Sequence, residues 1–354
     1  MKNGKYQVAI VGAGGIARWA HMPGWQKQDD VEILAVADPD WETAQKFAAD
    51  FNIPHVFTEY QKIAEMDQVD IVDVCAPNSV HCPASVSALL SGKHVLCEKP
   101  LAVKSSEVIE MITAANQTGK KLMCAQHQRF RKESRVVKDL IDDGVFGEIY
   151  FAQAQALRRR SVPARPTFIK KELSGGGPLL DIGVHILDLT YWFMGCPKVA
   201  SVKGVTFTKL AKREDVHGLW GEWDRQAYDV EDFAAGFIRF TNGTAISLSC
   251  SFLANITVIE DFSTILYGTQ AGIHWPNGKL ATEKNGVLQD IELHIPQHPE
   301  VRPHAEEIRV FLECVRENKP VPVKPEESLE VIKMLEGIYQ SAETGQEVIF
   351  APAG

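Results

Sequence analysis

The stretch Val8-Ala9-Ile10-Val11-Gly12-Ala13-Gly14-Gly15-Ile16-Ala17 decides the fold of this 354-residue chain. Apolar residues of strand type lead into a glycine turn, and a helical pattern follows. In that setting the glycines allow a tight turn and let the backbone approach a pyrophosphate at the helix N-terminus. The alternative is a tight βα turn without a ligand, but the flanking strand and helix favour dinucleotide binding. We assign this role to Gly12, Gly14, Gly15 and Ile16.

Asp38 is the candidate that selects the cofactor. It ends the second apolar run, about 20 residues beyond the glycines, where a carboxylate binds ribose hydroxyls and repels a 2′-phosphate. This position favours NAD over NADP. The alternative is that Asp38 caps the helix predicted to begin near Pro39 and Asp40.

Strand and helix patterns alternate from residue 7 to about residue 126. This is the rhythm of a parallel sheet with helices on both faces. We therefore expect a doubly wound Rossmann domain that binds NAD over residues 1–126. The predicted strands are 8–11, 32–37, 71–75, 95–97 and 122–125, and the predicted helices are 15–19, 41–51, 80–90 and 106–116.

The rhythm changes beyond residue 130, where longer strand-like runs carry hairpin signals such as Thr241-Asn242-Gly243. They predict an α+β domain with a large, mostly antiparallel open sheet over residues 127–354, which we assign to substrate binding and oligomerisation. Its predicted strands are 149–156, 199–207, 233–240, 245–252 and 256–267, and its predicted helices are 134–142, 304–317 and 326–343.

Composition limits the classes of partner. With 45% hydrophobic and 23% charged residues, the chain has the composition of a soluble globular protein. A net charge of −9 argues against a nucleic-acid partner. We expect no membrane segment and no signal peptide. The seven cysteines include no Cys-x-x-Cys pair, so we interpret them as reduced and expect a cytoplasmic protein.

A second stretch, residues 175–188, carries candidate catalytic groups. Asp181, His185 and Asp188 are spaced i, i+4 and i+7 on an otherwise apolar helical pattern, so they share one face of a buried helix. Buried charges need partners or a ligand-filled cavity. A structural Asp-His network is the alternative, but Gly175-Gly176-Gly177 beside it would let backbone approach a ligand and favours an active site.

Lys99 is a further candidate catalytic residue, because Glu98-Lys99-Pro100 closes an apolar strand of the first domain. Oxidation of an alcohol requires loss of the hydroxyl proton as hydride leaves the same carbon. We assign His185 as the general base, Lys99 as the group that orients and stabilises the hydroxyl, and Asp181 as a positioning partner. A surface lysine at the end of a strand is the alternative for Lys99.

These motifs together resemble the Gfo/Idh/MocA family of NAD(P)-dependent sugar and inositol oxidoreductases. The resemblance extends over nearly the whole chain, and Glu-Lys-Pro with Asp-x-Gly-x-His-x-x-Asp is its most specific part. It implies the same roles for Lys99, Asp181 and His185, and a dimer or tetramer contact through the open sheet. It also implies that Pro77, Asn78, His81, Glu98 and Lys99 lie along the cofactor, with Gln126 near the nicotinamide.

Substrate contacts follow no fixed pattern in the family. We assign them to His127 and Gln128, and to Arg159, Arg160 and Trp220, because arginines and tryptophan faces suit a polyol or sugar acid. A solvated basic loop and a packed interface loop are the alternatives for the last three. No metal site is expected, and His294, His298 and His304 are interpreted as loop residues.

The resulting prediction is an NAD-dependent oxidoreductase, with NADP less favoured, that transfers hydride between nicotinamide and a secondary hydroxyl of a sugar, inositol or sugar derivative. Two alternatives stay open. One is an enzyme that retains NAD and cleaves glycosides through transient oxidation. The other is a non-enzymatic, nucleotide-sensing regulator, for which so many groups suited to chemistry would be unnecessary.

Overall fold

Residues 4–296 and 302–350, which the computed structural model describes, belong to two units. The first unit contains residues 1–130 and 299–329, and the second contains residues 131–298 and 330–354. Helix α10 (Pro303–Arg316) therefore packs in the first unit although it follows the second sheet in the chain. The predicted division assigns residues 127–354 to the second domain, so it does not include the return of α10 to the first unit.

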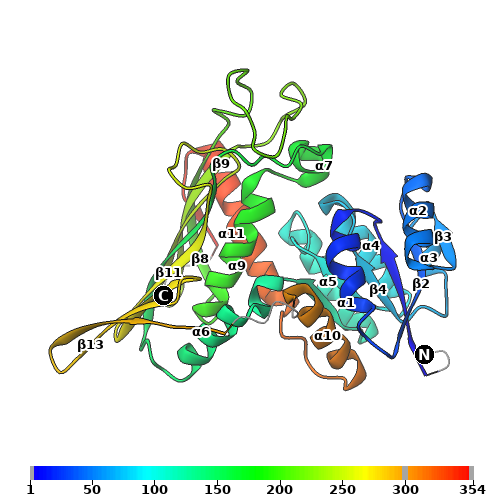
Figure 1. The fold of residues 1–354 in the computed structure, drawn as a ribbon, viewed down its shortest axis with the longest axis horizontal. Helices are drawn as coiled ribbons and strands as arrows, with labels where there is room; N and C mark the ends of the chain where they lie inside the picture. Colours follow the sequence, from blue (N-terminus) through cyan, green and yellow to red (C-terminus); the bar gives the residue numbers. More distant parts are fainter. Residues whose placement is uncertain (1–3, 297–301, 351–354) are drawn as a thin grey trace. The chain divides into compact units, whose positions relative to one another are not determined.

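Within the described residues, six parallel strands form the sheet of the first unit in the order β3-β2-β1-β4-β5-β6 (Figure 1). The order reverses between β1 and β4, where doubly wound sheets bind their ligands. The central strands are buried because helices cover both faces. The strands are β1 (Tyr6–Val11), β2 (Val31–Ala37), β3 (His55–Phe57), β4 (Ile71–Val74), β5 (His94–Glu98) and β6 (Leu122–Ala125).

The helices of this unit begin where local chemistry allows. Asp40 caps α2 by accepting a hydrogen bond from the Thr43 N–H at 3.1 Å, and α2 has the bounds predicted from the sequence. The short elements β3 and α3 were not predicted. The helices besides α10 are η1 (Ala17–His21), α1 (Met22–Trp25), α2 (Trp41–Phe51), α3 (Gln61–Ala64), α4 (Asn78–Leu90), α5 (Ser105–Thr118) and η2 (His127–Phe130).

A nine-stranded sheet forms the second unit within the described residues, in the order β14-β13-β12-β11-β7-β10-β9-β8-β15. It is mostly antiparallel, as predicted, with β7 and β10 as the parallel pair. The predicted hairpin at Thr241-Asn242-Gly243 joins β9 to β10. The strands are β7 (Ile149–Arg158), β8 (Val199–Phe207), β9 (Phe233–Phe240), β10 (Ala245–Ser251), β11 (Glu260–Gly268), β12 (Ala271–Trp275), β13 (Lys279–Lys284), β14 (Val287–Glu292) and β15 (Val348–Ile349).

Helices cover one face of this sheet, and α9 and α11 lie on the same side of it (Figure 1). The Gly204 N–H on β8 donates to Ser341 Oγ on α11 at 2.9 Å, which fixes that helix to the sheet. On the other face, Val205, Phe207 and Phe237 are more than 40% exposed. The helices are α6 (Lys132–Asp142), α7 (Pro166–Ile169), α8 (Lys171–Ser174), η3 (Leu179–Gly183), α9 (Val184–Phe193) and, from residue 330 onward, α11 (Pro325–Thr344).

The predicted fold class is therefore confirmed for both units. Among the described residues, helices of sufficient length and apolarity to cross a lipid bilayer are not found.

Candidate active site

The glycine turn connects β1 to η1 at the carboxyl edge of the first sheet. Gly12 has φ +96°, and a Cβ there would lie 2.7 Å from backbone atoms of Cys75 and Ala76. A Cβ on Gly14 would meet open space instead. Gly12 is thus required by the protein backbone, whereas Gly14 leaves room for a ligand. This arrangement fits the predicted pyrophosphate cradle.

The helix after the turn contains a π-helical segment, η1. Pro23 lacks an N–H for the Trp19 carbonyl, and that carbonyl accepts a hydrogen bond from Arg302 Nη1 at 3.2 Å instead. Widened turns of this kind occur often at functional sites. Here the segment ends at His21, whose side chain is fully buried. Neither the π segment nor a role for His21 was predicted.

Asp38 lies beside the glycine turn. Its Oδ2 accepts a hydrogen bond from the Ala13 N–H at 2.9 Å, and its Oδ1 accepts one from the Asp40 N–H at 3.0 Å. The cap of α2 is Asp40, so the alternative that Asp38 caps this helix is wrong. The contact with the turn is compatible with a carboxylate that faces a ribose.

The ends of β4 and β5 bring further predicted residues to the same edge. Glu98 ends β5 and is 5% exposed, and Lys99 follows it. Pro77 is the N-cap of α4, and Asn78 is its first residue. The ring of His81 lies between two backbone carbonyls, with Nδ1 2.7 Å from the Pro100 oxygen and Nε2 2.9 Å from the Ala76 oxygen. His81 therefore ties α4 to the segment after Lys99.

Residues after β6 complete this edge of the unit. Gln126 is buried, and His127 begins η2. The His127 ring stacks on the His304 ring with 4.0 Å between centroids, and Gln128 Nε2 lies 2.9 Å from His127 Nε2. The interpretation of His304 as a loop residue is wrong, because it lies on α10 and is 9% exposed. His294 lies beyond β14 in a loop, and His298 lies outside the described residues.

The second unit holds Asp181 and His185 on consecutive helical segments. Asp181 lies in η3, which is again π-helical, and His185 lies in α9 with 9% of its surface exposed. Asp188, one turn further, is fully buried. The predicted helix that carries these groups is therefore present, with a widened first part.

Gly176 and Gly177 are closely packed by other parts of the protein, contrary to the expectation that these glycines let backbone approach a ligand. A Cβ on Gly176 would lie 2.0 Å from Tyr339 Oη, and one on Gly177 would lie 2.2 Å from the Glu231 carbonyl oxygen. Glu231 is buried, and its carboxylate accepts hydrogen bonds from the Gly177 and Leu179 N–H groups at 3.0 Å each. The two glycines therefore serve close packing at the start of the helix, and the ligand interpretation is wrong for them.

Arg158 is a site residue that the sequence analysis did not assign. Its Nε donates to Glu260 Oε1 at 2.9 Å, and its Nη1 lies 3.9 Å from Asp181 Oδ2. Its guanidinium also lies over the Trp220 ring, 4.6 Å from the centroid. Arg158 thus joins Asp181 to the exposed Trp220 within this unit. The run of three arginines is recognisable in the sequence. Only the path of β7 in the structure decides which of the three side chains faces Asp181.

The other two arginines have different surroundings. Arg159 is exposed. Arg160 Nη1 donates to the Arg159 and Ala254 carbonyl oxygens at 2.6 and 3.0 Å, and its Nη2 donates to Asn255 Oδ1 at 2.5 Å. These bonds hold the Arg160 guanidinium against the segment after β10. A contact between Arg160 and substrate therefore has less support than one with the exposed Trp220.

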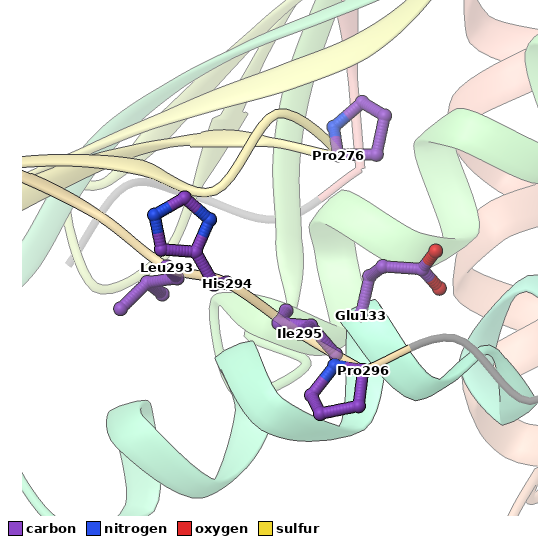
Figure 2. Close-up of a pocket in the computed structure, with 6 residues that line it drawn as sticks. All are labelled: Glu133, Pro276, Leu293, His294, Ile295 and Pro296. Atoms are coloured by element: carbon purple, nitrogen blue, oxygen red, sulfur yellow. The ribbon is translucent and has the colours of Figure 1, made fainter.

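A surface pocket of the second unit lies elsewhere. Figure 2 shows the residues that line it: Glu133 of α6, Pro276, and Leu293, His294, Ile295 and Pro296 of the segment after β14. The predicted site residues are not among those that line it. Those of the first unit lie at the carboxyl edge of its sheet, and those of the second unit lie in η3, at the start of α9, after β7 and in the loop that contains Trp220.

Comparison with known proteins covers both units. A family described as "Oxidoreductase family, NAD-binding Rossmann fold" matches residues 6–126, and the corresponding "Oxidoreductase family, C-terminal alpha/beta domain" matches residues 138–350. The chain belongs to the Gfo/Idh/MocA oxidoreductase family. The predicted family and the predicted enzyme class, an NAD(P)-dependent oxidoreductase, are confirmed.

Several members of the family are similar over most of the chain. The D-glucoside 3-dehydrogenase of Escherichia coli (strain K12) is 35% identical over 349 residues, which cover 98% of each protein. The scyllo-inositol 2-dehydrogenase (NADP(+)) of Bacillus subtilis (strain 168) is 30% identical over 295 residues, 82% of this chain and 83% of the relative. A structure of levoglucosan dehydrogenase with NADH and L-sorbose shares the fold, with a TM-score of 0.84, 21% identity and 98% of each chain covered.

Proposed function

We propose that this protein is an NAD-dependent dehydrogenase that transfers hydride between nicotinamide and a secondary hydroxyl of a sugar, inositol or sugar derivative. The observation that carries the proposal is the carboxyl edge of the first sheet. The open side of Gly14, the Asp38 carboxylate and Glu98-Lys99 lie at the carboxyl ends of β1, β2 and β5 of the same parallel sheet. This edge includes the β1/β4 switch point, where the fold binds dinucleotides.

The chemistry assigns a separate task to each polar group. Bound nicotinamide supplies the acceptor for the hydride. In the proposal, the Lys99 ammonium orients the substrate hydroxyl and stabilises negative charge on its oxygen, while His185 accepts the proton. Asp181 positions the substrate or the Lys99 head, and Arg158 holds Asp181 through the 3.9 Å contact.

The substrate class rests on relatives. The E. coli protein that is 35% identical over 98% of the chain is named a D-glucoside 3-dehydrogenase, so we propose a glucoside or a related cyclic polyol. In the second unit, Trp220 is 56% exposed with Arg158 over its ring, and an exposed indole beside charged groups is suited to the face of a sugar.

A panel of glucosides, free sugars and inositols tests the proposed function. With NAD, at least one member is expected to produce NADH continuously, as measured by absorbance, with one NADH formed for each keto product. A substrate that is cleaved without accumulation of NADH would instead support chemistry that retains the cofactor. Absence of both NADH and cleavage across the panel would contradict the proposed substrate class.

Asp38→Ala is expected to weaken NAD binding and to reduce discrimination against NADP. The carboxylate lies at the glycine turn, where it would bind the ribose hydroxyls and repel a 2′-phosphate. Isothermal titration calorimetry gives one Kd for NAD and one for NADP. The ratio of the NADP Kd to the NAD Kd should fall by about tenfold or more. Glu42→Ala, in the exposed first turn of α2, is the control and should leave the ratio unchanged. Unchanged NAD affinity in Asp38→Ala would contradict the ribose contact.

We further propose a homodimer or homotetramer formed through the second sheet, in a cytoplasmic protein. Val205, Phe207 and Phe237 support the assembly, because aromatic and branched side chains gathered on an open sheet face favour burial against another surface.

A further inference from the structure

Three buried charged side chains connect η1 to the segment that carries Lys99. His21 Nδ1 lies 3.0 and 2.9 Å from the two carboxylate oxygens of Asp73 on β4. His21 Nε2 lies 2.8 Å from Glu98 Oε1 at the end of β5. Asp73 and His21 are fully buried, and Glu98 is 5% exposed. We call Asp73, His21 and Glu98 the buried triad.

His21 carries the positive charge of the triad. A neutral imidazole has one N–H, whereas His21 faces a carboxylate at both ring nitrogens, so only the imidazolium satisfies both. Burial alone would lower the pKa of His21, but the charge and hydrogen bond of Asp73, with Cys75, outweigh it and raise that pKa well above its usual value. Near neutral pH the ring is therefore a double donor between two anions.

Glu98 is held from two sides. Its Oε1 faces His21, and its Oε2 accepts a hydrogen bond from the Lys99 backbone N–H at 2.9 Å. Burial would raise the pKa of Glu98, but the hydrogen bond and charge of His21, followed by the charge of Lys99, lower it to about 2. The ionised carboxylate thus links the imidazolium to the backbone of Lys99.

Among the described residues, the other groups that face His21 do not bring a second positive charge to it. Trp25 Nε1 donates to Asp73 Oδ2 at 2.7 Å, and Cys75 Sγ lies 3.6 Å from Asp73 Oδ1. From α10, burial lowers the pKa of His304 to about 4, so its ring is neutral near pH 7. Burial raises the pKa of Glu307 well above its usual value, and neither of its oxygens has a hydrogen-bond partner within the described residues.

A metal ion explains this cluster less well. The ligand atoms of His21, Asp73 and Cys75 lie within 4.8 Å of one another. Asp73 Oδ2 is instead at hydrogen-bond distance from two N–H groups, His21 Nδ1 at 2.9 Å and Trp25 Nε1 at 2.7 Å, so hydrogen bonds already account for this arrangement.

We propose that His21 is a positioning residue of the active site, which holds the Glu98 carboxylate and through it fixes the backbone from which the Lys99 side chain extends. The reason is geometric. Asp73 orients the ring from β4, the ring orients Glu98 on β5, and Glu98 Oε2 binds the amide of the next residue. The proposal rests on the proposed function, since the position of Lys99 affects turnover only if Lys99 contacts substrate.

A double-mutant cycle in the full-length protein tests this inference with His21→Gln, Glu98→Gln and the double variant. His21→Gln is expected to lower kcat by about tenfold or more, because misplacing a catalytic group by about 1 Å has effects of this size. KM should change by less than about threefold. Because His21 acts through Glu98, the double variant should have a kcat within about twofold of Glu98→Gln alone.

Lys93→Met is the matched control for loss of a buried polar group. Lys93 precedes β5, is 3% exposed, and donates to the Met66 and Val69 carbonyl oxygens at 2.8 and 3.3 Å. Lys93→Met should lower Tm and leave kcat unchanged. In combination with Glu98→Gln, the decreases in Tm of the two variants should add. A His21→Gln variant with lowered Tm and normal kcat would overturn the inference, as would losses in kcat that multiply in the double variant.

Failure of the proposed function is distinguishable from failure of this inference. If the unmodified protein forms no NADH with any substrate, the proposed function fails, and the triad is tested by nuclear magnetic resonance of ¹³C-methylated lysines. The Lys99 signal is assigned by its loss in Lys99→Arg. Its methyl chemical shift should change in His21→Gln, because the surroundings of the side chain change, and stay in place in Lys93→Met. An unchanged Lys99 chemical shift in His21→Gln would overturn the inference.

Discussion

His185→Ala is expected to lower kcat by at least about a hundredfold while NAD affinity stays nearly unchanged. Loss of a general base has an effect of roughly 10²–10⁴ on the rate, and His185 lies on α9 of the second unit, whereas the glycine turn belongs to the first. The measurements are NADH formation with the substrate found in the panel, and calorimetric titration with NAD. Added imidazole should restore part of the activity, because it supplies the missing base.

Thr190→Val is the control for His185→Ala. Thr190 lies on the same helix and is fully buried. Within the described residues, its hydroxyl donates to the Ile186 carbonyl oxygen and to no other acceptor. This variant should keep kcat within about twofold, since the hydroxyl that it removes bonds within the helix and His185 stays in place; loss of the bond should affect stability only. A His185→Ala protein that turns over at the normal rate would remove His185 from its proposed role.

Gly12→Ala and Gly14→Ala are expected to fail for different reasons. At Gly12, φ is +96° and the new Cβ would lie 2.7 Å from backbone atoms of Cys75 and Ala76, so strain and overpacking should each lower the free energy of unfolding by about 1–3 kcal/mol. Gly12→Ala should therefore lose both stability and NAD binding. Thermal unfolding without cofactor and calorimetric titration measure the two effects.

Gly14→Ala should keep its stability and lose cofactor affinity. The added Cβ meets open space in the protein, so the unfolding temperature without NAD should stay close to normal. The same methyl group would occupy the side from which the pyrophosphate approaches, and NAD affinity should fall by about tenfold or more. Normal NAD affinity in Gly14→Ala would show that the cofactor does not approach the turn at this residue.

Local chemistry explains which elements were predictable. Helix α2 was predicted with its observed bounds because its amphipathic pattern is local, although its cap is Asp40 and not Asp38, the cap considered from the sequence. The elements β3 and α3 are three and four residues long, too short for a periodic pattern. The π segment η1 depends on Pro23 together with Arg302, which donates to the Trp19 carbonyl from a distant part of the chain.

The candidate site, likewise, was predictable only where its motifs are local. Glu98-Lys99 and the glycine turn were recognisable because each motif is continuous in the chain. The glycines at 176 and 177 were misinterpreted, because the groups that crowd them, Tyr339 and Glu231, lie far away in the sequence. Arg158 was not assigned because a run of three arginines does not indicate which side chain faces Asp181.

The sequence by itself determined that this chain folds as a dinucleotide-binding α/β domain followed by an α+β domain, because strand, turn and helix patterns are local. Only the tertiary structure decided that His21 joins Asp73 and Glu98, which are 52 and 77 positions away. The physical reason is that buried charges require partners, and the order of strands in the sheet brings those partners together independently of their distance along the chain.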